Sequence, residues 1–98
     1  MNIGDIIAAR VSRNATPRYP RRAQRPGIEA VVTVSLTIDP DGRVSTVDIV
    51  DVEADRYADD FVKEAERAAL RTRFDPRTVG GVPVETVGVE KRYRFELD

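Results

Sequence analysis

The sequence predicts an α+β fold, in which a small antiparallel three-stranded sheet has two helices packed on one face. Three observations predict it. Apolar residues occupy every second position over 29–39, with mostly polar residues between them, which is the period of a strand with one covered face. A second apolar pattern, over 56–72, repeats with the spacing of a helix. A third pattern, over 84–97, alternates again.

Composition narrows the functions that the chain can perform. It has 98 residues, 41% of them hydrophobic and 34% charged, which is typical of one soluble domain. Sixteen basic and seventeen acidic residues give a net charge of −1, so there is no general attraction to nucleic acid. Without histidine or cysteine, a zinc site of those ligands and a Ser-His-Asp or Cys-His centre are excluded. We therefore expect that the protein is not an enzyme and that it has no catalytic residue, metal or cofactor.

The first sixteen residues are expected to lie outside the domain proper, which we place at 17–98. Ile3, Ile7 and Val11 recur every four residues, which favours a short amphipathic helix that packs on the domain or forms a dimer contact. The alternative is a leader or linker that frays. Pro17 ends any helix here, because the residue before a proline avoids the helical region.

A short helix is expected between Tyr19 and Gly27. Pro20 suits the first helical position and Gly27 the end. The segment is rich in arginine, which could indicate a phosphate or nucleic-acid site. Because aromatic residues do not alternate with the arginines and the chain is not basic overall, the pattern favours a solvated helix face. The residues concerned are Arg18, Arg21, Arg22 and Arg25.

The first strand is expected to bury every second side chain, and its turn leads into a second strand over 44–52. The inward residues of the first strand are Ala30, Val32, Val34, Leu36 and Ile38. Asp39-Pro40-Asp41-Gly42 predicts a tight turn, and it lacks the further ligands of a calcium loop. In the second strand we expect Val47 and Ile49 on one face, and on the other Val44, Val50 and Val52.

The second helix is expected to pack on the sheet through one stripe of mostly small residues. The stripe contains Phe61, Ala65, Ala68, Ala69 and Thr72, and is widened by Val62 and Leu70. Glu64 and Glu66 lie on the other face near arginines, so we interpret them as members of surface ion pairs rather than as a catalytic pair. Pro76 prevents the helix from continuing.

The last strand, over 84–97, follows a Gly80-Gly81 turn. Its inward set is expected to be Val87, Val89, Tyr93, Phe95 and Leu97. Lys91 interrupts this set, and an inward charge is one way in which proteins protect an exposed sheet edge. Tyr93 is expected to cap the core with its hydroxyl in water.

The motifs and their order resemble the TonB C-terminal domain family over residues 17–97. The matching segments are Tyr19-Pro20, Ala23-Gln24, Gly27-Ile28, Asp41-Gly42-Arg43-Val44, Arg73-Phe74-x-Pro76 and Tyr93-Arg94-Phe95-Glu96-Leu97. Thr72 occupies the position where the family usually has tryptophan, which removes a large packing element.

The resemblance implies binding without catalysis. The extended TonB box of an outer-membrane transporter would add as a strand to the last strand of this domain, coupling inner-membrane energy to the uptake of siderophores or similar nutrients in the periplasm. A contact with ExbB–ExbD would require an N-terminal membrane anchor, which we do not find in the sequence. The implied partner-binding residues are Thr16, Pro17, Arg18, Tyr19, Pro20, Val89, Glu90, Lys91, Arg92, Tyr93, Arg94 and Phe95.

A second interpretation is a structural module that forms a homodimer through its last strand. Residues 85–87 extend that strand beyond the length that a three-stranded sheet needs. An antiparallel self-pair would be closed by its own symmetry.

Overall fold

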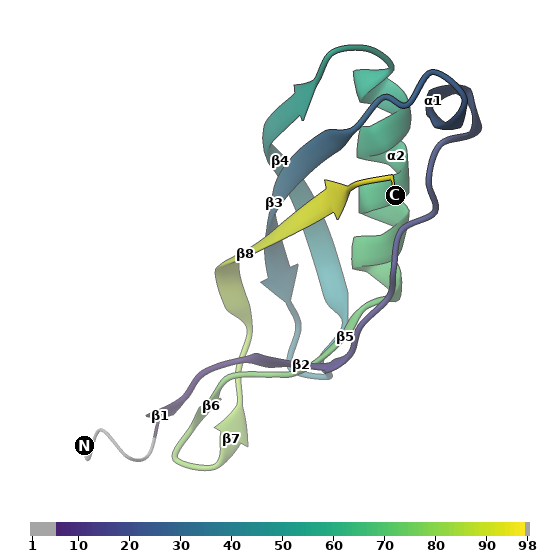
Figure 1. Ribbon diagram of the computed structural model, residues 1–98. Helices are drawn as coiled ribbons and strands as arrows, with labels where there is room; N and C mark the ends of the chain where they lie inside the picture. Colours follow the sequence, from purple (N-terminus) through teal and green to yellow (C-terminus); the bar gives the residue numbers. More distant parts are fainter. Residues whose placement is uncertain (1–5, 98) are drawn as a thin grey trace.

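The computed structural model describes residues 6–97 and confirms an α+β fold with two helices and antiparallel sheets (Figure 1). Its main sheet has three strands in the order β4-β3-β8. β3 (Ala30–Ile38) is the central strand, and β4 (Val44–Ala54) and β8 (Thr86–Phe95) pair with it on either side, both antiparallel. The predicted three-stranded sheet is therefore present, although it is not the whole of the β-structure.

The alternation in β3 builds the core as expected. Its inward side chains are all buried, with none more than 5% exposed: Ala30, Val32, Val34, Leu36 and Ile38. The residues between them are half-buried on the opposite face of the sheet. Burying each large aliphatic side chain contributes about 1.5 to 3 kcal/mol, so this strand is a main source of stability.

β4 differs from the prediction because two β-bulges change its alternation. The register skips Ser45 and Val50, each of which is an extra residue relative to β3. Val44, Val47 and Val52 consequently lie opposite buried β3 residues, all on the helix-covered face. The predicted division of these valines between two faces was wrong, because a strict period of two cannot anticipate an inserted residue.

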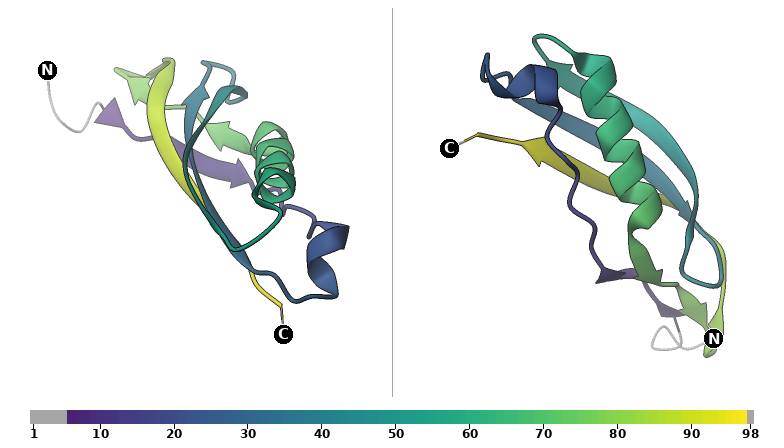
Figure 2. Two further views of the ribbon diagram at one scale, coloured as in Figure 1. Left: turned by 90° about the horizontal axis from the view of Figure 1, so that it is seen from above. Right: turned by 90° about the vertical axis from the view of Figure 1, so that its right-hand side faces the viewer.

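α2 (Ala58–Arg71) covers the sheet with the predicted stripe (Figure 2, right). The buried residues are Phe61, Ala65, Ala68, Ala69 and Thr72. Small side chains at three of these positions let the helix approach the sheet closely. Leu70 was assigned to this stripe wrongly, since it is 57% exposed.

α1 (Arg21–Gln24) is a single turn on the same side of the sheet, beside the N-terminal half of α2 (Figure 2). Ala23 is its buried residue. Gly27 follows with φ +70°, and the amide of Ile28 donates to the carbonyl of Ala23 at 3.0 Å, which closes the turn. The helix begins one residue after the predicted start at Pro20 and ends three residues before Gly27.

The N-terminal segment forms strands where a helix was considered. β1 (Ile6–Ile7) pairs with β6 (Thr78–Val79), and β2 (Arg10–Arg13) pairs with β5 (Arg73–Asp75). β6 also pairs with β7 (Val82–Pro83) across the Gly80-Gly81 turn. The amphipathic helix is therefore not formed over 6–13, while Ile3 lies outside the described residues. We call β1, β2, β5, β6 and β7 the ribbon.

The ribbon and the helices lie at opposite ends of an elongated molecule, whose extents are 54 × 22 × 20 Å (Figure 1). Within residues 6–97, no helix is both long and apolar enough to cross a membrane.

Candidate partner-binding edge

β8 forms one edge of the main sheet, and along 89–95 that edge is regular. Seven successive residues, Val89 to Phe95, pair in unbroken register with Leu36 to Ala30 of β3. On its other side β8 pairs with no strand among residues 6–97. Its outer backbone groups are therefore available to another strand.

The side chains of this edge divide into two groups. Glu90, Arg92 and Arg94 are exposed on the face of the sheet away from the helices. Tyr93 and Phe95 are buried in the core, with exposures of 4% and 2%. Of the residues predicted to bind a partner, these two can therefore offer only their backbone.

Lys91 lies among the core-facing residues of β8 and is half-buried. Its ammonium is 5.3 Å from the centre of the Tyr93 ring, a cation–π contact that compensates part of its burial. The prediction that Lys91 marks an edge strand is confirmed.

The start of β8 departs from the predicted inward set. The register with β3 jumps from Val89 to Thr86, so Val87 and Gly88 form an irregularity, with Gly88 at φ +70°. Val87 is consequently 70% exposed, although we predicted it to be inward. Leu97, also predicted to be inward, is 37% exposed beyond the strand's end.

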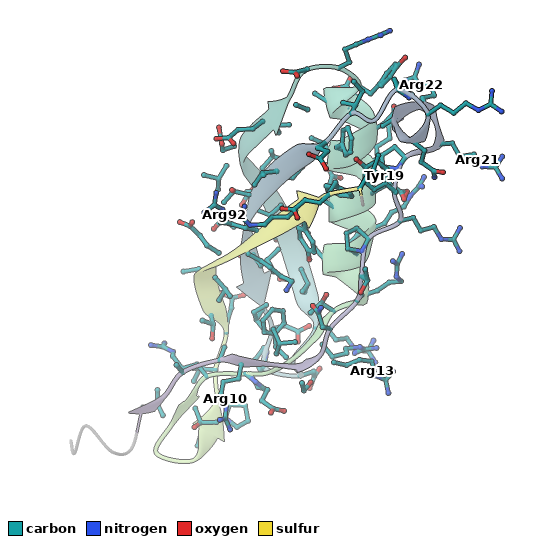
Figure 3. All side chains as sticks on the ribbon, viewed as in Figure 1. Arg10, Arg13, Tyr19, Arg21, Arg22 and Arg92 are labelled. Carbon is teal, nitrogen blue, oxygen red and sulfur yellow. The ribbon has the colours of Figure 1, made fainter. Side chains whose placement is uncertain are left out.

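Tyr19 joins the two predicted partner-binding segments. Its ring packs edge-on against Phe61 and Phe95, with centroid distances of 5.8 and 5.9 Å (Figure 3). Its hydroxyl donates a hydrogen bond to the carbonyl of Ile28, and burial raises its pKa, with a further contribution from Glu29. Such aromatic pairs contribute about 0.5 to 1.5 kcal/mol beyond their buried area. Segment 16–20 is therefore held beside the end of β8.

The other residues of that segment vary in exposure. Thr16 and Arg18 are exposed, Pro17 is half-buried and Pro20 is buried. The backbone oxygen of Thr16 accepts a hydrogen bond of 3.5 Å from Arg71 of α2.

The hydroxyl of Tyr93 is buried, not in water as predicted. No hydrogen-bond partner meets it among the described residues. Burial raises the pKa of Tyr93, and the Thr72 hydroxyl and Arg71 offset part of the rise. The Thr72 hydroxyl itself donates to the carbonyl of Ala68 at 2.9 Å.

Arg22 connects the two helices. Its guanidinium forms two hydrogen bonds of 2.9 Å with the Asp60 carboxylate and lies 4.7 Å from the centre of the Tyr57 ring. The hydrogen bond from Arg22 lowers the pKa of Asp60, and the same bond raises the pKa of Arg22. This pair links α1 to α2 at the surface.

Comparison with known proteins identifies the family. Residues 15–97 match the family described as Gram-negative bacterial TonB protein C-terminal. The chain belongs to the TonB C-terminal domain family. It is 37% identical over 81 residues to protein TonB of Pseudomonas aeruginosa, which is 83% of this chain and 22% of that protein. It is 40% identical over 70 residues to protein TonB of Escherichia coli K12, 71% of this chain and 28% of that protein.

A solved structure of this family has the same fold. The solution NMR structure of the P. aeruginosa TonB CTD superposes with a TM-score of 0.72 at 34% identity, over 100% of this chain and 92% of that one. The chain spans 22 to 28% of the length of the two TonB proteins that it matches.

The sequence did not predict the ion pair between Arg22 and Asp60, which lie 38 residues apart. Arg22 was interpreted only as part of a solvated helix face. Only the packing of α1 beside α2 brings the two residues together.

Proposed function

We propose that this domain binds the TonB box of an outer-membrane transporter by strand addition to β8, in the periplasm, and so couples inner-membrane energy to nutrient uptake. Family membership supports the general role in energy transduction. Siderophores are the expected class of transported nutrient, and ExbB–ExbD the expected source of energy through an anchor preceding the domain.

The difference between the two edges of the main sheet carries this proposal. The β8 edge keeps an unbroken register over Val89 to Phe95. The β4 edge is interrupted by bulges at Ser45 and Val50, and bulges disrupt the hydrogen-bonding ladder that an added strand needs. β8 is thus the better template for a peptide strand.

Binding should be weak and reversible. Each backbone hydrogen bond contributes about 0.5 to 1.5 kcal/mol net, whereas ordering a peptide costs about 1 to 2 kcal/mol per residue. Over six residues these terms nearly cancel, so side-chain contacts determine a Kd expected to be micromolar or weaker. Such an affinity suits a transient mechanical link.

The test is an amide NMR titration of the isotope-labelled domain with a TonB-box peptide from a candidate transporter. We expect shift changes concentrated at Val89–Phe95 that saturate at micromolar to millimolar peptide. Two further peptides carry N-methyl groups on one or the other set of alternate residues. The one whose methyl groups face β8 should not bind, because it lacks the backbone donors that pair with β8. Shift changes centred on β4, or undiminished binding of both N-methylated peptides, would contradict strand addition to β8.

The exposure of Val87 supports a second function, self-pairing through β8. This side chain is 70% exposed at the start of the strand, and a symmetric partner could cover it. Sedimentation over a hundredfold range of concentration distinguishes the two. A monomer throughout favours peptide capture, whereas a dimer that Val87→Asp dissociates favours self-pairing.

A further inference from the structure

A cleft of about 580 Å³ lies between α1 and α2, and the family assignment does not explain it. Arg18 and Arg21 line it from the α1 side, and Lys63 and Arg67 from α2. Figure 3 shows Arg21 and Arg22 projecting from the α1 turn, with Tyr19 nearer the end of β8. The cleft is open to solvent, so an extended segment can lie along it.

The cleft is strongly positive. Its lining includes five cations and two carboxylates, an excess of three positive charges, whereas the whole chain carries −1. Arg22 is neutralised by Asp60, and Arg67 by Glu64 at 2.8 Å. Within residues 6–97, the remaining three cations of the lining form no ion pair: Arg18, Arg21 and Lys63.

The cleft also lies next to the edge of the sheet. Tyr19 lines it and packs against Phe95, the last residue of β8, at 5.9 Å between ring centres. A strand that adds to β8 and continues past Phe95 therefore leads toward the cleft.

We propose that this cleft binds an acidic segment of the transporter, directly beyond the part that adds to β8. The inference rests on the proposed function, which supplies the strand. Arginine guanidinium groups bind carboxylates with two parallel hydrogen bonds, and the cleft offers two arginines and a lysine. The acidic segment would then determine which transporter is bound and in which direction its strand runs.

Charge and shape favour a peptide over the other polyanions. A net charge of −1 gives no long-range attraction to nucleic acid or to an anionic membrane. Among the described residues, only three cations of the lining are left without an ion pair, which suits a single chain with a few carboxylates better than a dense phosphate array.

The test compares two pairs of peptides by NMR titration, at each of two spacer lengths. Each peptide carries the TonB box, a Gly-Ser spacer of two or four residues (about 7 or 13 Å when extended) and a tail of Asp-Asp-Glu or of Asn-Asn-Gln. One pair has the tail after the box and the other has it before. In one of the two pairs we expect the acidic tail to lower the Kd about threefold to tenfold, and to shift amides of α1 and of 63–67. The gain should vanish near 0.5 M salt, where the screening length is about 4 Å.

The matched variants distinguish binding of the acidic tail in the cleft from a general effect of positive charge. Arg21→Gln/Lys63→Gln should abolish the gain from the acidic tail while leaving the binding of the neutral tail unchanged. Arg25→Gln removes an exposed arginine close to α1 that does not line the cleft, and should retain the gain.

Each outcome decides between the proposals. Equal affinity for the two tails, or a gain that survives the double substitution, overturns the cleft proposal and leaves strand addition intact. Acid-dependent shifts in the cleft without shifts along β8 overturn the proposed function and support carboxylate binding by the cleft alone. Shifts in neither region overturn both.

Discussion

The two ends of this molecule are stabilised by different interactions. At the helix-covered end, side chains from β3, α2 and β8 interlock, and Leu36, Val34 and Phe61 are completely buried. At the ribbon end, every residue of β2 is exposed, as is Val82 at 61%. The first end is held by apolar packing and the second mainly by main-chain pairing. Apolar packing and main-chain pairing therefore dominate at different ends of one chain.

Gly42 and Phe74 connect the two ends. The amide of Phe74 in β5 donates to the carbonyl of Gly42 in the β3–β4 turn at 2.9 Å, and the Phe74 side chain is buried. Asp39 holds the turn through hydrogen bonds that its carboxylate accepts from the amides of Asp41 and Arg43. The Asp39 side chain therefore stabilises the predicted turn.

The largest loss of stability is expected from Phe61→Ala, which removes a buried ring from the packed end. The Phe61 ring contacts the rings of Tyr19 and Phe95, with centroid distances of 5.8 and 5.0 Å. Its removal leaves a cavity, so the free energy of unfolding should fall by about 3 to 5 kcal/mol. Urea denaturation measures this. A loss below about 1 kcal/mol would show that the core is not centred on this residue.

Gly42→Ala tests the contact between the β3–β4 turn and β5, and should cause the next largest loss of stability. Gly42 has φ +88°, and an added Cβ would lie 2.1 Å from the Phe74 carbonyl oxygen, so the backbone must move. We expect a loss of about 2 to 3 kcal/mol in the free energy of unfolding. Gly81→Ala is the matched control, because it has φ +81° with open space around it, and it should cost about 1 kcal/mol. Equal thermal shifts for the two variants would refute the close contact.

Removal of residues 1–13 tests the ribbon and should have a small effect. The hydrogen bonds lost contribute about 0.5 to 1.5 kcal/mol each, but about 1 to 2 kcal/mol per residue of ordering cost is recovered. The free energy of unfolding should therefore change by less than about 1 kcal/mol, and hydrogen exchange at β3 should remain slow. If the truncated chain loses more than about 2 kcal/mol, the ribbon is an integral part of the core.

The smallest expected effect is the acid dependence that comes from Asp60. Because Arg22 lowers the pKa of Asp60 below its ordinary value of 3.8, the ion pair stabilises the fold above about pH 4. That contribution is lost as the pH falls through the lowered pKa. Asp60→Asn should therefore flatten the stability profile below about pH 4. Asp59→Asn removes a neighbouring carboxylate of the same helical turn, and should leave this part of the urea-midpoint profile unchanged.

The sequence predicted the packed end better than the ribbon, for a physical reason. In β3 and α2, burial imposes a periodic pattern of apolar residues, and the pattern was readable at Val32, Leu36 and Phe61. Bulges in β4 and at the start of β8 insert residues that break the period, so Val50 and Val87 were misplaced. β2 buries nothing and has no such signal. The basic cleft depends on the packing of α1 beside α2, which no local pattern encodes.

The central claim is that a transporter peptide becomes the fourth strand of the main sheet, next to β8. Its most direct test is an isotope-filtered NOE measurement between the labelled domain and an unlabelled TonB-box peptide. We predict a ladder of contacts between peptide backbone protons and those of Val89 to Phe95. A ladder along β4, or contacts to side chains of β8 without any to its backbone, would contradict the account.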